Sequence, residues 1–357
     1  MERTEQNSGT IEVRSSHRFD VAALATWMED NVHDFRPPLR VEQFRGGQSN
    51  PTYKLTDSAG RAFVLRRKPP GKLLPGAHAV DREYRVLAAL GEQGFPVPRV
   101  HGLCLDETVI GTAFYVMDMV EGRIFWDTDL PQVPRKERAA YFDAMNATIA
   151  ALHRIDPDAA GLGDYGKPGN YFERQIGRWS KQYLGDVEAG RVAAMDRLVE
   201  WLPAHIPASA GEESRVIHGD FRCDNMIFHP TEPRVIAVLD WELSTLGHPL
   251  ADFTYHLMMY RMPAGATTGL AGLDLPALCI PSEEEYVAAY CRRTGRDGIA
   301  NVDFYIAFNM FRLAAIVHGI KGRLARGTAS SAHADRMAAS LEPLAELAWA
   351  QAARAGA

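Results

Sequence analysis

The chain has 357 residues, of which 46% are hydrophobic and 24% charged, and its formal net charge at pH 7 is −6. This composition is typical of a globular protein, and the length suffices for two lobes with separate cores. The negative charge argues against nucleic acid as a partner, and the lack of an apolar run near the roughly 20 residues that span a bilayer argues against a membrane.

The cysteines and the N-terminal residues indicate where the protein works. The four cysteines show no C-x-x-C spacing, so we expect neither a disulfide framework nor a thiolate metal site, and a cytoplasmic location fits best. Residues 1–16 are polar with charges of both signs, unlike the apolar centre of a signal peptide. We expect a flexible leader, or one that orders only on contact with the rest of the chain.

The first predicted elements are a helix and three strands. Asp20 is suited to the N-cap of a helix that ends near Val32, because apolar residues follow it at helical spacing. Between residues 41 and 68 the sequence predicts strand, glycine turn, strand, turn and strand. The glycine turn consists of Gly46, Gly47, Gln48, Ser49 and Asn50. By itself, such a turn is more typical of an ordinary hairpin than of a ligand site.

The third strand ends in a cationic run. Strand alternation places Arg66 on the same face as Val64, and we expect that face to point inward, although Lys68 shares it. A helix over residues 77–91 follows, is stopped by glycines, and carries Glu83. The alternative for Glu83 is an exposed position near two arginines of the same helix.

The next elements extend the sheet and begin a helical region. Strands are predicted over residues 100–105 and 112–119, and a helix over 134–155. Residues 161–166 spell G-x-G-x-x-G, but a helix precedes them where a dinucleotide site requires a strand, so we expect a loop. Two helices should follow between residues 171 and 203. No G-x-x-x-x-G-K-[ST] sequence occurs, which excludes a P-loop kinase.

Residues 216–242 carry the most specific pattern of the chain. His218, Asp220 and Asn225 fit H-x-D-x-x-x-x-N, which in protein kinases supplies a catalytic base and a metal ligand. An apolar run, a proline-rich turn and a β-branched run ending at Asp240 then predict a hairpin. Because Asn225 and Asp240 lie about equally far from the turn, the hairpin should bring their oxygens together. Mg²⁺ binds one or two such oxygens together with phosphate and water.

The same stretch suggests how a phosphoryl group could be transferred. Asp220 would act on an acceptor hydroxyl beside the metal, as general base or as orienter of the attacking oxygen. Arg222 could neutralise charge on the transferring phosphoryl group, with an ordinary surface arginine as an equal alternative. His218 is expected to hold the loop through hydrogen bonds.

Four further helices are predicted, over residues 251–262, 282–293, 302–326 and 332–355. The first three should supply an acceptor pocket. The third has a basic bias, from Arg312, His318, Lys321, Arg323 and Arg326. Cations are favoured at a helix C-terminus, which explains this bias from Lys321 onward but not at Arg312. The bias mildly favours an anionic acceptor, whereas three glutamates at residues 283–285 point the other way.

The central stretch resembles the aminoglycoside phosphotransferase and choline kinase branch of the protein-kinase-like fold, whose loop reads HGD where protein kinases usually read HRD. Two segments most resemble the kinase-like domain fused to some acyl-CoA dehydrogenases. They are VLRRKPPGKLLPGAHAVDREYRVL, residues 64–87, and DWELSTLGHPLADFTYHL, residues 240–257. The resemblance extends from about residue 40 to about residue 330.

The resemblance implies an α+β, bilobal protein-kinase-like fold. The small N-terminal nucleotide-binding lobe, residues 1–118, would contain an antiparallel sheet plus a helix. A hinge at residues 119–122 would lead to a larger, mostly helical C-terminal lobe, residues 123–357, for catalysis and acceptor binding. Within that lobe, Asp252 would be a buried structural carboxylate that accepts backbone N–H groups from the catalytic loop.

The resemblance also implies contacts with ATP. The turn at residues 46–50 would lie over the phosphates, where backbone N–H groups can approach them. Arg66 would contact the α and β phosphates in place of the family's usual lysine, with Glu83 as its ion-pair partner. Main-chain groups at Asp118 and Val120 would recognise adenine.

The resulting hypothesis is a Mg²⁺-dependent phosphotransferase that moves the γ-phosphoryl group of ATP to a hydroxyl of a small molecule. The fused relatives suggest a hydroxyacyl-CoA or a hydroxy acid as acceptor, by analogy. An aminoglycoside, choline or a sugar is an alternative acceptor. A non-catalytic nucleotide-binding pseudokinase is an alternative from another class, against which Asp220, Asn225 and Asp240 speak. A protein kinase is disfavoured, because the segment from Asp240 to Asp252 is too short for a long activation segment. The oligomeric state is left open.

Overall fold

The computed structural model describes residues 9–45, 50–69, 79–211, 213–265, 269–328 and 334–357. Contacts divide the chain into two compact units, each described by itself. The first comprises Met1–Thr148, Asp158–Leu162 and Arg222–Ser244; the second comprises Ile149–Pro157, Gly163–Phe221 and Thr245–Ala357. These units follow packing alone, so the predicted lobes, 1–118 and 123–357, stay a prediction.

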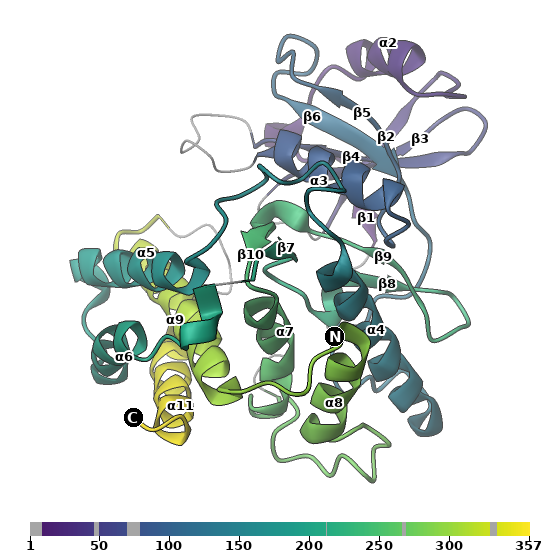
Figure 1. Ribbon diagram of the computed structural model, residues 1–357. Helices are drawn as coiled ribbons and strands as arrows, with labels where there is room; N and C mark the ends of the chain where they lie inside the picture. Colours follow the sequence, from purple (N-terminus) through teal and green to yellow (C-terminus); the bar gives the residue numbers. More distant parts are fainter. Residues whose placement is uncertain (1–8, 46–49, 70–78, 212, 266–268, 329–333) are drawn as a thin grey trace. The chain divides into compact units, whose positions relative to one another are not determined.

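The first unit is built on a six-stranded antiparallel sheet with the strand order β1-β2-β3-β4-β6-β5 (Figure 1). The strands are β1 (Thr10–Ile11), β2 (Arg40–Phe44), β3 (Thr52–Thr56), β4 (Ala62–Arg67), β5 (Val100–Cys104) and β6 (Phe114–Asp118). The sequence predicted all of them except β1. Residues 10 and 11 belong to the expected leader, and they order on contact with β2, where the Thr10 hydroxyl donates to Glu42 Oε1 at 3.0 Å.

Strand alternation gives this sheet two different faces. One face packs on α2 (Val21–Asn31), whose N-cap Asp20 accepts two backbone N–H bonds as predicted. The buried side chains of this face are Tyr53, Leu55, Phe63, Leu65, Phe114 and Val116. The other face lies toward α3 (Val80–Glu92) (Figure 1). It carries Arg66 and its cross-strand neighbour Tyr115, both of which contact Glu83 of α3. The alternation that buries Leu65 against α2 therefore directs Arg66 toward α3.

The remainder of the first unit includes most of α4 (Arg138–Arg154) and the predicted hairpin of β8 (Met226–Phe228) and β9 (Val235–Val238). Arg123 anchors the hairpin, because its N–H and C=O each bond to the main chain of Phe228 at 2.8 Å. Short 3₁₀ turns are η1 (Ser15–His17), η2 (Arg135–Glu137), η5 (Cys223–Asn225) and η6 (Trp241–Leu243).

The second unit is organised around α9 (Val302–Ala325), a long helix buried along most of its length (Figure 1). The helices that pack on α9 are α5 (Tyr171–Gly185), α6 (Ala193–Ala204), α7 (Pro249–Leu257), α10 (Ala334–Ala339) and α11 (Leu341–Arg354). The unit also contains α8 (Glu283–Thr294), η3 (Val187–Ala189), η4 (Ala208–Gly211) and η7 (Met258–Tyr260). Among the described residues, no helix combines the length and apolarity needed to cross a bilayer.

Two features of the second unit differ from the sequence predictions. The single helix expected over residues 332–355 is wrong, because α10 and α11 are separated at Ser340. Pro343 lacks an N–H and is tolerated only in the first turn of a helix, which starts α11 anew at Leu341. A two-stranded ladder of β7 (Arg215–Ile217) and β10 (Thr245–Gly247) was not predicted, since three-residue strands carry no readable period.

Two buried histidines flank α7. His248 precedes the helix and its Nδ1 accepts the N–H of Leu250 at 3.2 Å. His256 lies in the last turn, and its Nε2 is 2.7 Å from the hydroxyl of Tyr286. Burial lowers the pKa of each histidine from 6.5 to about 4. Both side chains are therefore neutral at pH 7.

We expect acid to destabilise the protein through these histidines. Because their pKa values are lower in the folded state, the stability they contribute is complete above pH 6.5 and is lost as the pH falls toward 4. At pH 5 each should lower the free energy of unfolding by up to about 2 kcal/mol. Urea unfolding at pH 7.5 and 5, in wild type, His256→Gln and the exposed control His33→Gln, measures this. An unchanged pH dependence in His256→Gln would contradict the assignment to His256.

Candidate active site

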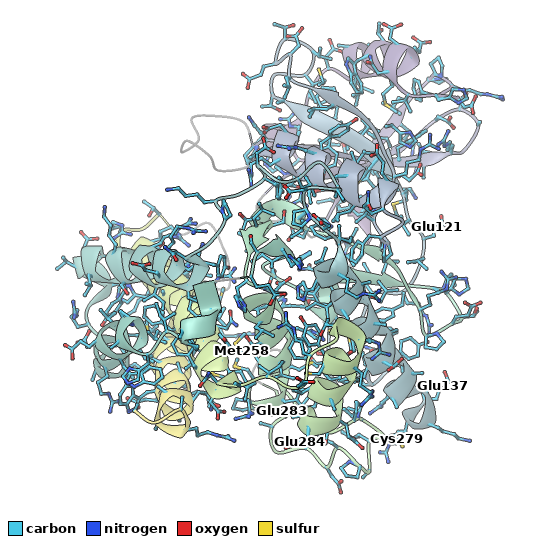
Figure 2. All side chains as sticks on the ribbon, viewed as in Figure 1. Glu121, Glu137, Met258, Cys279, Glu283 and Glu284 are labelled. Atoms are coloured by element: carbon cyan, nitrogen blue, oxygen red, sulfur yellow. The ribbon has the colours of Figure 1, made fainter. Side chains whose placement is uncertain are left out.

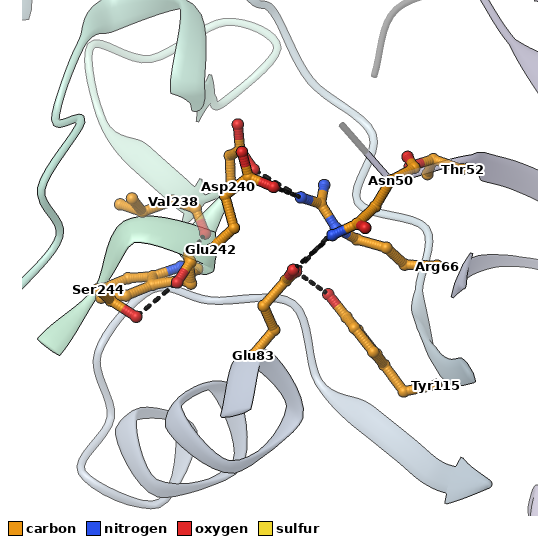
Figure 3. A network of polar contacts seen from close by, with 10 residues as sticks. Asn50, Thr52, Arg66, Glu83, Tyr115, Val238, Asp240, Glu242 and Ser244 are labelled. Carbon is orange, nitrogen blue, oxygen red and sulfur yellow. Dashed lines mark hydrogen bonds and ion pairs between the residues drawn. The ribbon is translucent and has the colours of Figure 1, made fainter. Parts of the chain in front are cut away.

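One polar cluster, in the first unit, is centred on the guanidinium of Arg66 (Figure 3). Its Nε lies 2.7 Å from Glu83 Oε2, as an ion pair without hydrogen-bond geometry, and its Nη2 donates to Asp240 Oδ1 at 2.6 Å. Glu242 Oε2 lies 3.5 Å from the same Nη2. Only 12% of the Arg66 side chain is exposed. A nearly buried cation is therefore surrounded by three carboxylates from α3 and the end of the hairpin.

Glu83 is held in place through both of its oxygens. Oε1 accepts from the Asn50 amide at 2.9 Å, and Oε2 accepts from the Tyr115 hydroxyl at 3.0 Å (Figure 3). The side chain is buried, so the alternative of an exposed helical glutamate is wrong and the predicted ion pair with Arg66 is confirmed.

Burial and charge act in opposite directions on this pair. Burial raises the pKa of Glu83, and this effect exceeds the lowering by Arg66. Burial lowers the pKa of the Arg66 guanidinium, but attraction to Glu83 and then to Asp240 and Glu242 raises it overall. Arg66 therefore carries a permanent positive charge.

The other residues predicted to bind nucleotide are only partly described. Gly46, Gly47, Gln48 and Ser49 lie outside the described residues. The Asn50 amide donates to Glu83 and the Asn50 carbonyl accepts from the Thr52 hydroxyl at 3.0 Å, and the predicted phosphate contact of Asn50 stays a prediction. The N–H of Asp118 bonds to the carbonyl of Arg99 at 2.8 Å, so an adenine contact there would use the carbonyl of Asp118. Val120 follows β6, and its predicted adenine contact stays a prediction.

The two predicted metal ligands lie at the open end of the hairpin, as the sequence indicated. Met226 pairs with Val238, and the N–H of Leu239 bonds to the carbonyl of Asn225 at 2.8 Å, which brings Asp240 next in register. Asp240 adopts a left-handed conformation with φ of 66°. Its Oδ1 pairs with Arg66, whereas its Oδ2 has no partner among the described residues.

This donor set fits a hard divalent cation. A carboxylate and an amide are oxygen donors of the kind Mg²⁺ prefers, and the cluster around Arg66 contains more carboxylates than cations. Within the described part of the chain, no group of three or more His, Cys, Asp or Glu residues could hold a metal. Asn225 and Asp240 would thus need phosphate and water to complete the coordination.

The residues after Asp220 have partners that the sequence did not reveal. Arg222 Nη2 donates to Asp224 Oδ2, so part of the charge of Arg222 is compensated two residues away. Its predicted role toward a phosphoryl group stays a prediction. Between them, Cys223 is buried, and burial together with the nearby Asp224 raises the pKa of its thiol to about 12. This cysteine is therefore not a nucleophile.

A second polar cluster, in the second unit, is centred on the buried carboxylate of Asp252. Oδ2 accepts the N–H of His218 at 2.7 Å, and Oδ1 accepts the N–H of Gly219 at 2.8 Å. His153 Nε2 lies 3.2 Å from Oδ2. Burial raises the pKa of Asp252, but hydrogen bonds from His153 and the loop lower it overall. The predicted structural role of Asp252 is confirmed.

Short elements bring these groups together. β10 pairs with β7 and leads directly into α7, so the first turn of α7, with Asp252, lies beside the residues that follow β7. Gly219 has φ of 84°, a conformation that glycine adopts without strain. This conformation points its N–H at Asp252 and its carbonyl at Arg312, whose Nη2 donates to that oxygen at 2.7 Å.

Asp220 is held by a residue that the sequence analysis missed. The hydroxyl of Tyr255 donates to Asp220 Oδ1 at 2.5 Å, and the guanidinium of Arg312 lies 5.4 Å from the centre of the Tyr255 ring. The N–H of Asp220 bonds to His218 Nδ1 at 3.2 Å, which confirms the predicted role of His218 in the loop. Tyr255 comes three residues after Asp252, and this helical spacing was the available signal.

The charged residues considered for an acceptor pocket have structural partners. Arg312 holds the carbonyl of Gly219, and His318 Nε2 lies 2.7 Å from the carbonyl of Gly190. Glu283 lies at the start of α8 (Figure 2), and its Oε2 is 2.5 Å from Arg261 Nε. Glu285 forms a capping box with Ser282. These residues therefore do not by themselves indicate the charge of an acceptor.

We expect Asp252→Asn to destabilise the protein by about 2–4 kcal/mol, because the asparagine amide would place N–H donors against backbone N–H donors. Chemical denaturation of Asp252→Asn and of the exposed control Asp297→Asn measures this. The control should lie within about 0.5 kcal/mol of wild type. Equal stability of the two variants would contradict the role assigned to Asp252.

Solved structures identify the class of fold. A crystal structure of a protein from Ralstonia eutropha, named as a candidate aminoglycoside phosphotransferase, matches with a TM-score of 0.87 and 51% identity over 94% of this chain and 99% of that chain. A choline kinase from Cryptosporidium parvum matches with a TM-score of 0.60 and 11% identity, over 90% and 96% of the two chains. The predicted protein-kinase-like fold is confirmed.

Residues 40–305 match the model of the phosphotransferase enzyme family, and the chain belongs to this family. Among curated relatives, acyl-CoA dehydrogenase family member 10 of Mus musculus is 45% identical over 321 residues, covering 89% of this chain and 30% of the relative. Acyl-CoA dehydrogenase family member 11 of Rattus norvegicus is 43% identical over 343 residues, covering 94% and 44%. The chain thus spans less than half the length of these relatives.

Proposed function

We propose that this chain transfers the γ-phosphoryl group of ATP, with Mg²⁺, to a hydroxyl group of a small molecule. The observation that carries the proposal is the buried Arg66 guanidinium, fixed by Glu83 on one side and paired with Asp240 on the other. A buried cation with one fixed carboxylate and one partly exposed carboxylate is suited to receive phosphate oxygens.

The residues divide into those that hold nucleotide and those that hold the acceptor hydroxyl. Glu83 would keep Arg66 in position. The phosphates of ATP would then replace Asp240 as the partner of the positive charge of Arg66. Asn225 and Asp240 would hold Mg²⁺, which neutralises charge on the phosphates. Asp220, oriented by Tyr255, would align the attacking hydroxyl and accept its proton.

The acceptor we propose is a hydroxyacyl-CoA or a hydroxy acid. The relatives with 43–45% identity are named as acyl-CoA dehydrogenases, and this chain matches less than half of each. A phosphorylating domain beside such an enzyme fits a hydroxylated acyl substrate. A polycationic aminoglycoside is less favoured, because two of the three glutamates considered for it, Glu283 and Glu285, are engaged by Arg261 and by the helix cap.

The experiment that tests the function is ADP release from Mg-ATP across a panel of acceptors. The panel contains 3- and 4-hydroxyacyl-CoAs, free hydroxy acids, choline, sugars and aminoglycosides. We expect turnover with hydroxyacyl-CoAs or hydroxy acids, lowered about a hundredfold or more by Asp220→Asn, because the hydroxyl loses its proton acceptor. Turnover with another class would replace the acceptor proposed here. Nucleotide binding without any turnover would favour a pseudokinase.

A second variant tests how Asp220 is positioned. Tyr255→Phe removes the hydroxyl that donates to Asp220 Oδ1 at 2.5 Å, so the carboxylate should become less well oriented. We expect kcat to fall about tenfold, with KM for ATP and acceptor within about twofold and an unchanged melting temperature. Tyr84→Phe, a half-buried tyrosine of α3, is the control. Unchanged kcat in Tyr255→Phe would remove Tyr255 from the mechanism.

A further inference from the structure

We infer that an open pocket in the second unit, between α5 and the C-terminal end of α9, binds the phosphate groups of a small molecule. The pocket has a volume of about 510 Å³. Its lining residues are Arg178, Lys181, Gln182, Gly185, Asp186 and Arg326. None of them belongs to the polar clusters around Arg66 and Asp252. The volume lies within the roughly 300–1,000 Å³ typical of small-molecule sites.

Two cations of this pocket have no carboxylate partner among the described residues. Arg178 and Lys181 are three residues apart on α5, so their side chains leave the same helix face. Both are exposed, and neither forms an ion pair within the described part of the chain. The guanidinium of Arg178 lies 5.2 Å from the centre of the Trp179 ring. Two neighbouring cations without an acid repel each other and favour a bound anion.

The third cation is held rigidly at the other side of the pocket. Arg326 donates to both oxygens of Asp186, at 2.7 and 3.0 Å. Asp186 in turn lies against Gly322, where a Cβ atom would be 2.0 Å from Asp186 Oδ2. The glycine therefore lets the carboxylate approach α9 and orient Arg326 one turn further along. α5 and α9 lie side by side in this unit (Figure 1).

The absence of side chains keeps the pocket open. A Cβ atom built on Gly185, at the C-terminal end of α5, would meet no atom of the described residues within 4 Å. Gln182, by contrast, is fixed, because its amide donates to the carbonyl of Ala315 at 3.2 Å. The site thus combines open space with two side chains, Gln182 and Arg326, that hydrogen bonds already hold, which lowers the entropic cost of binding a ligand.

The chemistry of the lining selects the ligand. The three cations of the lining face one lining carboxylate, Asp186, and a second one beside the pocket, Glu188, whose Oε2 lies 3.4 Å from Arg326 Nη1. Cations therefore outnumber carboxylates here, in a chain whose net charge is −6, and the six lining residues include no aromatic side chain. Guanidinium groups bind phosphate oxygens in pairs, and cations one turn apart suit a diphosphate or two separate phosphates. The identity of the ligand rests on the proposed function: if the acceptor is a hydroxyacyl-CoA, the ligand of this pocket is the phosphate-bearing CoA end of that acceptor.

Binding of coenzyme A to the full chain tests the site directly. Calorimetry is performed with saturating Mg²⁺ and AMP-PNP, so that coenzyme A cannot use the ATP site. We expect Arg178→Ala/Lys181→Ala to weaken binding about tenfold or more, because two cation–phosphate contacts are lost. The matched control Arg135→Ala/Lys136→Ala removes two exposed cations outside the pocket and should change the affinity less than about twofold. Inorganic pyrophosphate is titrated in parallel.

A kinetic comparison shows whether the pocket binds the phosphates of the CoA acceptor or those of a free phosphate compound. The pocket variant should raise KM for a hydroxyacyl-CoA about tenfold and leave KM for the same acyl group on pantetheine, which lacks phosphates, unchanged. Pyrophosphate binding without coenzyme A binding would assign the pocket to a free phosphate and overturn its link to the acceptor. Binding of neither, or equal losses in both variants, would overturn the site. A failure of the proposed function would show as no turnover with any acceptor, which leaves the calorimetric result intact.

Discussion

The buried charge of Arg66 is the constraint on which the first unit depends. A guanidinium removed from water is tolerated only where carboxylates compensate it, so β4, α3 and the end of the hairpin must meet at this point. The same requirement extends outward, because Glu83 is itself buried and its oxygens are satisfied by Asn50 and Tyr115. The need to satisfy the Glu83 oxygens also fits the register of β4 and β6, in which Tyr115 lies opposite Arg66 and so reaches Glu83.

A buried charge of the opposite sign organises the loop of the second unit. Asp252 is compensated mainly by backbone N–H groups and by His153, so its partners are fixed by chain geometry more than by side-chain identity. This explains a glycine at position 219, where a residue with φ of 84° must present its N–H to Asp252 and its carbonyl to Arg312. Asp220 is thereby set on a loop whose main chain is bonded on both sides.

Features that follow from strand or helix periodicity could be predicted from the sequence. Contacts between residues far apart in the chain could not. Alternation along β4 placed Arg66 on the inward face but did not separate it from Lys68, which shares that face; the ion pair with Glu83 identifies Arg66. The family pattern was sufficient to predict the roles of Glu83 and Asp252. The contact of Arg312 with Gly219 requires knowing how α9 packs, which no local pattern contains. Helical spacing places Tyr255 on the face of Asp252, but it does not reveal that the Tyr255 hydroxyl bonds to Asp220. The ladder of β7 and β10 was missed because pairing, not the composition of three residues, makes it. The break at Ser340 was readable from Pro343.

Residues that hold the fold together differ from those that could select the acceptor. Arg66, Glu83 and Asp252 are committed to buried networks, so they can vary little without loss of the fold, and they carry no information about the acceptor. Specificity must then come from groups that the fold leaves uncommitted. In the second unit, Arg178 and Lys181 are such groups, since packing gives them no ion-pair partner among the described residues and their charge opposes that of the chain. A local positive field on a negative protein draws anionic ligands selectively, and it rejects the polycations that an acidic pocket would collect.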